Sequence, residues 1–241
     1  MSRSKPTTAV KTATPSDCWR LADAVLGHCD RVLLSGPSGT GKTLWALTQG
    51  LPPGQEAMYS VLTEDTPAAE IRGMFVPRDG AFVWQDGPAV TAWRRGTRLV
   101  LDEIDHASGE VMTLLMAITD SLPTARLSLP TCETVRPAAG FSVIATMNGN
   151  PDHLPPALRD RFPVAIEIDA VHPGALATLP VDVREAASAT ALLPPERRLS
   201  VRGWKRFAGL RDVVGAQDAA TAVFGRERAG DVLDALKLAA A

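Results

Sequence analysis

The sequence predicts an α/β fold, in which a parallel sheet is sandwiched by helices, followed by a small all-helical domain. Short apolar runs of strand length alternate with segments of helical pattern through most of the chain, which is typical of a parallel sheet. Beyond Asp169 these runs stop, and Ala-rich helical segments follow to the last residue. We therefore expect a flexible N-terminal tail over residues 1–15, an α/β domain over residues 16–170 and a helical domain over residues 171–241.

Five segments are expected to form the strands. The first, third and fourth are almost continuously apolar, as strands covered by helices on both faces should be. In chain order the expected strands are Arg31–Ser35, Ala57–Thr63, Arg98–Asp102, Phe141–Thr146 and Val164–Ile168.

Helical patterns lie between these runs, and two further segments have turn signals of their own. Residues 15–26 and 42–49 have helical composition, and residues 109–121 place apolar side chains at helical spacing. Residues 73–87 and 124–140 carry Pro/Gly turn signals beside short β-like runs, which predicts hairpin insertions.

Composition excludes several classes of protein. The chain has 241 residues, of which 45% are hydrophobic and 22% charged, with a formal net charge of −2. These values exclude intrinsic disorder, and no apolar run reaches the ~18 residues that a membrane-spanning helix requires. The polar residues 1–15 are unlike a secretory signal, and Cys18, Cys29 and Cys132 are widely spaced. The odd number and wide spacing of the cysteines, with no CxxC pair, favour a reducing, cytoplasmic location and argue against a structural zinc site.

One motif predicts a site for a nucleoside polyphosphate, and hence a P-loop NTPase fold. It matches GxxxxGK[ST] at each fixed position and lies between an expected strand and an expected helix. Glycines let backbone N–H groups approach phosphate, the lysine adds a mobile cation, and the threonine hydroxyl suits Mg²⁺. The motif comprises Gly36, Pro37, Ser38, Gly39, Thr40, Gly41, Lys42 and Thr43.

Two carboxylates follow the third expected strand. Asp102 and Glu103 stand at its C-terminal end, where ligands of open α/β sheets bind. Adjacent strand residues point to opposite faces, so the two side chains should have different roles. We expect Asp102 to hold Mg²⁺ through its water shell and Glu103 to activate the attacking water.

The ordered set of motifs resembles the AAA+ ATPase superfamily. Within it, the chain is similar to the MoxR and dynein-related branch, which includes CbbQ, NorQ, GvpN and midasin-type modules. The superfamily motifs are GPSGTGKT, LVLDEID, SVIATMNGN and LPPALRDRF, and the branch-level segments are LTEDTPAAEIRG, FVWQDGP and RLSLPTCETVRPAAGF. The resemblance covers about residues 17–230 and implies Mg²⁺-dependent ATP hydrolysis by a ring, usually a hexamer.

The resemblance also implies roles for four polar residues. Asn148 matches the sensor 1 position, although a turn-forming role in the Asn148–Pro151 cluster is an alternative. Arg161 matches the arginine finger that completes a neighbouring subunit's site, and Arg159 is a second candidate for it. Arg202, in a helical lid, matches the sensor 2 arginine.

Three functional classes remain open. The first is a chaperone-like motor that remodels or activates a protein partner, in relatives often a von Willebrand factor A-domain protein. The second is a nucleic-acid-translocating motor, which the near-neutral charge and the scattered arginines of the insertions disfavour. The third is a nucleotide-gated scaffold with little turnover. Phe75, Phe82 and Trp84 of the first insertion could grip a peptide or partner; the alternative is that Phe82 and Trp84 pack in a local core.

Overall fold

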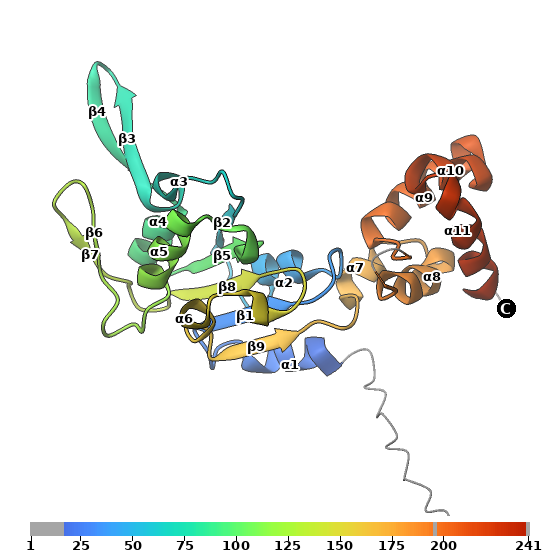
Figure 1. Cartoon of the computed structure of the whole chain (residues 1–241), viewed down its shortest axis with the longest axis horizontal. Coiled ribbons are helices and arrows are strands. Elements are labelled where there is room, and N and C mark those ends of the chain that lie inside the picture. Colours follow the sequence, from blue (N-terminus) through green and yellow to red (C-terminus); the bar gives the residue numbers. More distant parts are fainter. Residues whose placement is uncertain (1–16, 195–196, 240–241) are drawn as a thin grey trace, which may run out of the picture.

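The computed structural model describes residues 17–194 and 197–239 of the chain (Figure 1). Its central feature is a five-stranded sheet in which every neighbouring pair is parallel, in the order β2-β5-β8-β1-β9. This arrangement confirms the predicted α/β class, whereas the expected flexible tail (residues 1–15) lies outside the described residues. The strands are β1 Arg31–Ser35, β2 Met58–Val61, β5 Arg98–Asp102, β8 Ser142–Thr146 and β9 Val164–Glu167.

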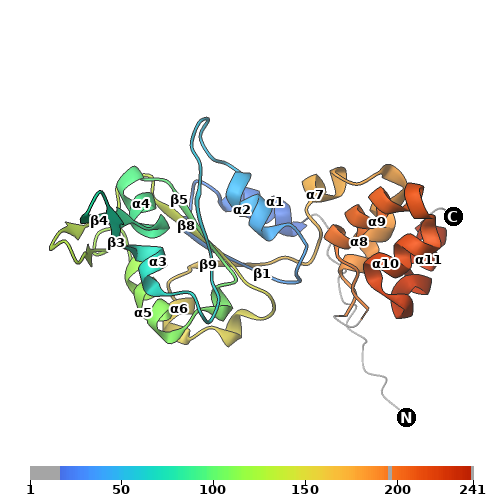
Figure 2. The same ribbon diagram turned by 90° about the horizontal axis from the view of Figure 1, so that it is seen from above.

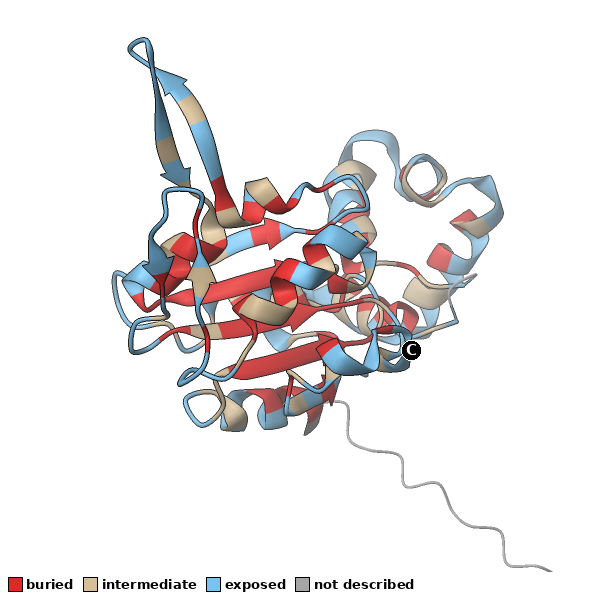
Figure 3. Ribbon diagram, turned by 60° about the vertical axis from the view of Figure 1, so that its left-hand side comes forward, coloured by how far each residue is buried: buried red, intermediate tan, exposed pale blue. Residues whose placement is uncertain are grey.

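Helices cover both faces of this sheet, and the alternation of side chains along each strand explains the two layers. Along β1, Val32 and Leu34 pack with Trp45 in one cluster, whereas Leu33 packs with Trp93 in the other. The first cluster is covered by α1 (Asp17–Val25) and α2 (Lys42–Thr48), and the second by α3 (Ala68–Arg72), α4 (Pro88–Arg95), α5 (Gly109–Ile118) and α6 (Pro156–Arg159). Figure 2 shows α1 and α2 on one side of the strands and α5 and α6 on the other. Figure 3 shows the burial of the central strands.

Two antiparallel hairpins project from the end of the molecule opposite the helical domain (Figure 1). The larger pairs β3 (Gly73–Arg78) with β4 (Ala81–Asp86), and the smaller pairs β6 (Leu127–Ser128) with β7 (Thr134–Val135). The Arg94 guanidinium joins the base of the larger hairpin to the connecting turn of the smaller one, because it donates hydrogen bonds to Asp86 at 2.8 Å and to Glu133 at 2.7 Å.

The aromatic side chains of the larger hairpin have different surroundings. The Trp84 ring is half-buried, contacts the Phe75 ring edge to face at 5.4 Å between centroids, and packs against the domain core. Phe82, nearer the tip, is 76% exposed. Trp84 therefore belongs to a local core at the hairpin base, while Phe82 faces solvent.

The C-terminal residues form a separate helical cluster with its own core. It contains α7 (Pro173–Ala177), α8 (Val181–Ala191), α9 (Val201–Val214), α10 (Ala216–Phe224) and α11 (Arg226–Ala239). Trp204 and Phe207 are fully buried at its centre, and the Trp204 indole donates to the Thr190 hydroxyl at 2.8 Å. None of the helices that the structure describes is long and apolar enough to cross a membrane.

Candidate functional site

The loop after β1 approaches residues 168–172 so closely that only glycine fits at positions 36 and 41. Gly36 has φ +134°, and a Cβ there would lie 2.4 Å from the Ile168 carbonyl oxygen. Gly41 has φ +106°, and a Cβ there would lie 2.7 Å from the His172 Cβ. Positive φ and close approach both require glycine, so this loop is held against the segment that leads into the helical domain.

We expect Gly36→Ala to unfold at clearly lower urea concentration than the matched variant Gly149→Ala. Both positions have positive φ, but a Cβ at Gly149 meets nothing within 4 Å. Gly149→Ala should therefore lose only the ~1 kcal/mol of backbone strain, whereas Gly36→Ala should lose several kcal/mol more because backbone must move. Equal unfolding midpoints and slopes in the two variants would contradict this close approach.

Lys42 lies at the centre of the site, although it is only 6% exposed. Its ammonium group donates to the carbonyl oxygens of Gly36 at 2.9 Å and Pro37 at 2.8 Å, and to the Asn148 amide oxygen at 3.2 Å. Burial lowers the pKa of Lys42 to about 8, and the nearby carboxylates of Asp102 and Asp105 partly oppose this shift. A buried cation held by neutral acceptors is suited to receive an anion.

Asp102, the last residue of β5, accepts hydrogen bonds from three hydroxyl groups. Its Oδ1 accepts from Thr43 of α2 at 2.9 Å and from Thr146 of β8, and its Oδ2 accepts from Tyr59 of β2 at 3.0 Å. The two residues that the sequence analysis assigns to Mg²⁺, Thr43 and Asp102, therefore lie in contact. These hard oxygen donors are the ligand type that Mg²⁺ prefers.

A cavity of about 470 Å³ joins these groups to the helical domain. Glu103, with a left-handed backbone (φ 58°), lines it beside Asp102. The side chains of Leu44 and Val201 form an apolar part of its wall. Arg202, in the first turn of α9, also lines it. The cavity's size and mixed lining fit a nucleotide whose phosphates lie at Lys42.

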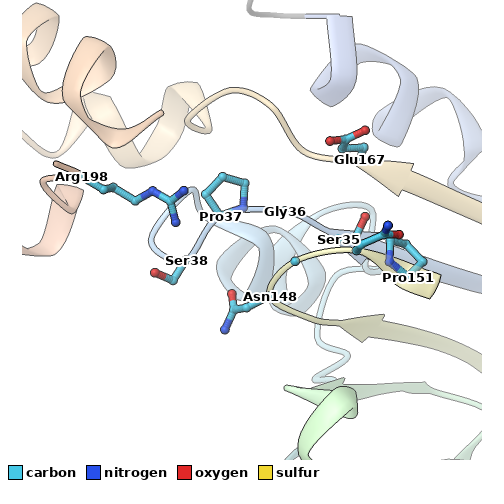
Figure 4. Close-up of a pocket in the computed structure, with 10 residues that line it drawn as sticks. Ser35, Gly36, Pro37, Ser38, Asn148, Pro151, Glu167 and Arg198 are labelled. Atoms are coloured by element: carbon cyan, nitrogen blue, oxygen red, sulfur yellow. The ribbon is translucent and has the colours of Figure 1, made fainter. Parts of the chain in front are cut away.

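A second cavity, of about 570 Å³, is lined by the end of β1 and the first residues of the loop that follows it. Its lining includes Glu167 and Asn148, and Figure 4 shows the Arg198 side chain reaching from the helical domain toward Pro37 and Ser38. Asn148 lines both cavities.

The two candidate finger arginines lie away from this chain's own nucleotide cavity. Arg161 donates to the Asp120 carboxylate at 2.5 Å, and Arg159 pairs with Asp152. The Ser121 backbone N–H and the Arg161 guanidinium hold the pKa of Asp120 below its ordinary value. The structure thus brings Lys42, Thr43, Asp102, Glu103, Asn148 and Arg202 together and leaves both finger candidates outside.

Sequence reasoning missed four residues of this region. Tyr59 and Thr146 contact Asp102, Lys205 lines the nucleotide cavity, and Arg198 lines the second cavity. Lys205 follows Arg202 by three residues, so helical periodicity could have placed both on one face. No local pattern marks Tyr59.

The side chains around Asp102 also suit a Mg²⁺ ion that binds together with a nucleotide. No group of three or more His, Cys, Asp or Glu side chains that could hold a metal occurs in the described part of the chain. Mg²⁺ in such sites uses one or two protein oxygens together with substrate phosphates and water. Thr43 and Asp102 are the residues that would hold it.

Comparison with known proteins places this architecture in a family. The family model described as "AAA domain (dynein-related subfamily)" matches residues 31–162. The protein NorQ of Paracoccus denitrificans is 34% identical over 149 residues, which cover 59% of this chain and 53% of NorQ. Midasin of Dictyostelium discoideum is 32% identical over 154 residues, 61% of this chain and 3% of midasin.

The matches to relatives are partial, and the family model covers the site. The chain spans about half the length of NorQ and a small part of midasin. A crystal structure of a Cytophaga hutchinsonii protein superposes with a TM-score of 0.47 at 20% identity, covering 65% of this chain and 47% of that one. The family match extends over more than half of the residues and includes the phosphate-binding loop, the acidic strand end and Asn148. The chain belongs to the dynein-related subfamily of AAA domains.

Proposed function

We propose that this chain hydrolyses ATP with Mg²⁺ in a ring of its own copies and uses the hydrolysis to remodel or activate a protein partner. The observation that carries the proposal is the convergence of Lys42, the Thr43–Asp102 pair, Glu103 and Asn148 at one edge of the sheet. This set contains the groups that phosphoryl transfer to water requires.

Each residue has a role that follows from its chemistry. When ATP binds, the Lys42 ammonium gives up its hydrogen bonds to the backbone carbonyls and donates to the β- and γ-phosphates instead. When bound, Mg²⁺ neutralises phosphate charge and polarises the bond that breaks. The Glu103 carboxylate accepts a proton from the attacking water, and the Asn148 amide orients that water. The ADP–γ-phosphate bond breaks as the water oxygen joins phosphorus.

The separation of the finger candidates from their own cavity supports a ring. Arg161 lies outside the cavity that contains Lys42, so it can complete a site only on another copy of the chain. An arginine supplied in trans stabilises the charge of the transition state. We favour a hexamer, as in the family, with Arg161 rather than Arg159 as the finger.

The larger hairpin favours a protein partner over nucleic acid. Residues 73–86 contain one arginine and two aspartates, so they offer phosphate groups no net attraction. Phe82 at 76% exposure and Phe75 at 46% exposure instead offer apolar surface, which marks protein-binding sites. A von Willebrand factor A-domain protein is the partner class that the family suggests.

Hydrolysis measured against protein concentration tests the ring. We expect the specific ATPase activity to rise steeply with concentration, in step with the assembled fraction seen by mass photometry. Duplex DNA added at saturating concentration should leave this activity unchanged. Full specific activity at dilutions that contain only single chains would contradict the trans site, and strong stimulation by DNA would favour a nucleic-acid motor.

A further inference from the structure

Tyr59, the single tyrosine of the chain, lies beside the acidic strand end. It belongs to β2, the edge strand that pairs with β5 so that Val61 stands opposite Asp102. Its hydroxyl donates a hydrogen bond to the Asp102 Oδ2 at 3.0 Å. Tyr59 does not line the nucleotide cavity, and its hydrogen bond to that lining is the one to Asp102.

The three hydroxyl contacts fix the orientation of the Asp102 carboxylate. Each carboxylate oxygen can accept about two hydrogen bonds. Thr43 and Thr146 both donate to Oδ1, and among residues 17–194 and 197–239 Tyr59 alone donates to Oδ2. The terminal torsion of an aspartate has a broad energy well, so without Tyr59 the carboxylate could rotate about its contacts at Oδ1. With Tyr59 in place, one acceptor position of Oδ2 remains available.

We propose that Tyr59 is a positioning residue for Mg²⁺: its hydroxyl orients Asp102 so that the free acceptor of Oδ2 receives the metal or its water shell. The inference rests on the proposed function, because it assumes that Mg²⁺ binds with nucleotide at Thr43 and Asp102. The hydroxyl acts on Asp102 as the hydrogen-bond partners of other metal ligands do, and loss of such partners typically weakens metal binding 10–100-fold.

Tyr59→Phe tests this role, because it removes one oxygen and keeps the ring. We measure equilibrium binding of a fluorescent, non-hydrolysable ATP analogue to the full chain, first without metal and then across a Mg²⁺ titration. The metal-free affinity should stay within about twofold, and the half-saturating Mg²⁺ concentration should rise about tenfold. In an Asp102→Asn background the same substitution should have little further effect.

Thr113→Val is the matched control, since it removes an exposed hydroxyl that donates to the Gly109 carbonyl of its own helix. It should leave the Mg²⁺ titration unchanged. An unchanged Mg²⁺ requirement in Tyr59→Phe would show that the contact is structural only. A lower Mg²⁺ requirement would show that the hydroxyl competes with the metal, and either result overturns the proposal.

A second measurement needs no nucleotide. With a ¹³Cζ-tyrosine label, the nucleotide-free protein gives one side-chain NMR signal, because the chain has one tyrosine. That signal should move in Asp102→Asn and stay in place in Thr113→Val; no movement in Asp102→Asn would overturn the contact itself. If the wild type binds no analogue, the proposed function fails, and this signal still reports on the Tyr59 contact.

Discussion

Lys42→Ala is expected to abolish measurable binding of ATP and ADP, a loss of about 100-fold or more in affinity. The Lys42 ammonium lies where the loop after β1, the start of α2 and Asn148 meet, and its donors are directed to neutral oxygens. Alanine removes the buried cation and leaves the Gly36 and Pro37 carbonyl oxygens facing the phosphates. Isothermal titration calorimetry of each nucleotide with the purified variant gives the affinity directly.

Lys237→Ala provides the matched control for this loss. Lys237 also bears one positive charge, but it is exposed on α11 and pairs with Asp234 at 3.1 Å. Its removal should change nucleotide affinity less than twofold, because exposed charges at a distance are screened. Retention of tight ATP binding by Lys42→Ala, with the same thermal stability as the wild type, would contradict the assignment of the phosphate site.

The strands and the phosphate loop could be predicted because their signals are local. The sequence pattern predicts β1 and β5 with the bounds that the structure has. The apolar run of β1 is followed by Gly36, and that of β5 ends at the acidic Asp102. The loop after β1 could be predicted because its close approaches at positions 36 and 41 admit only glycine. The sequence therefore shows glycine at both positions. In both cases a few adjacent residues contain the physical cause of the structure.

The full set of contacts at Asp102 depends on sheet order, which local patterns do not contain. β2 and β8 are the two neighbours of β5 in the sheet, and this brings the hydroxyls of Tyr59 and Thr146 to one carboxylate. Neither residue differs locally from an ordinary strand residue. Their role becomes visible only when the strands are placed side by side.

Tertiary packing likewise decides the surroundings of Arg198 in the helical domain and of Phe82 and Trp84 in the larger hairpin. Arg198 reaches the second cavity because the chain before α9 passes the loop after β1, and a Cβ at Gly39 would lie 3.4 Å from the Ser200 Cβ. Phe82 and Trp84 share one face of the hairpin by their spacing. Their distances from the domain core decide that one is exposed and the other half-buried.

Arg161→Ala should lower ATP turnover about 1,000-fold, the scale of an arginine finger, and leave nucleotide affinity nearly unchanged. The Arg161–Asp120 ion pair is about one-third exposed at each side chain, so its loss should cost little stability. The substitution therefore removes the charge that we propose to act at a neighbouring site, and it spares the chain's own cavity, which Arg161 does not line. Steady-state phosphate release and analogue binding separate these two effects.

Mixing with Glu103→Gln subunits shows where Arg161 acts. Each variant alone lacks one group at every interface, so both should be almost inactive. In a mixed ring, an Arg161→Ala subunit supplies an intact Glu103 while its Glu103→Gln neighbour supplies an intact Arg161, and that interface should regain turnover. Arg159→Ala is the matched control: if it loses turnover and is rescued while Arg161→Ala is not, Arg159 is the finger. Lack of rescue for both variants, in rings shown to contain both subunits, would mean that neither arginine acts across the interface.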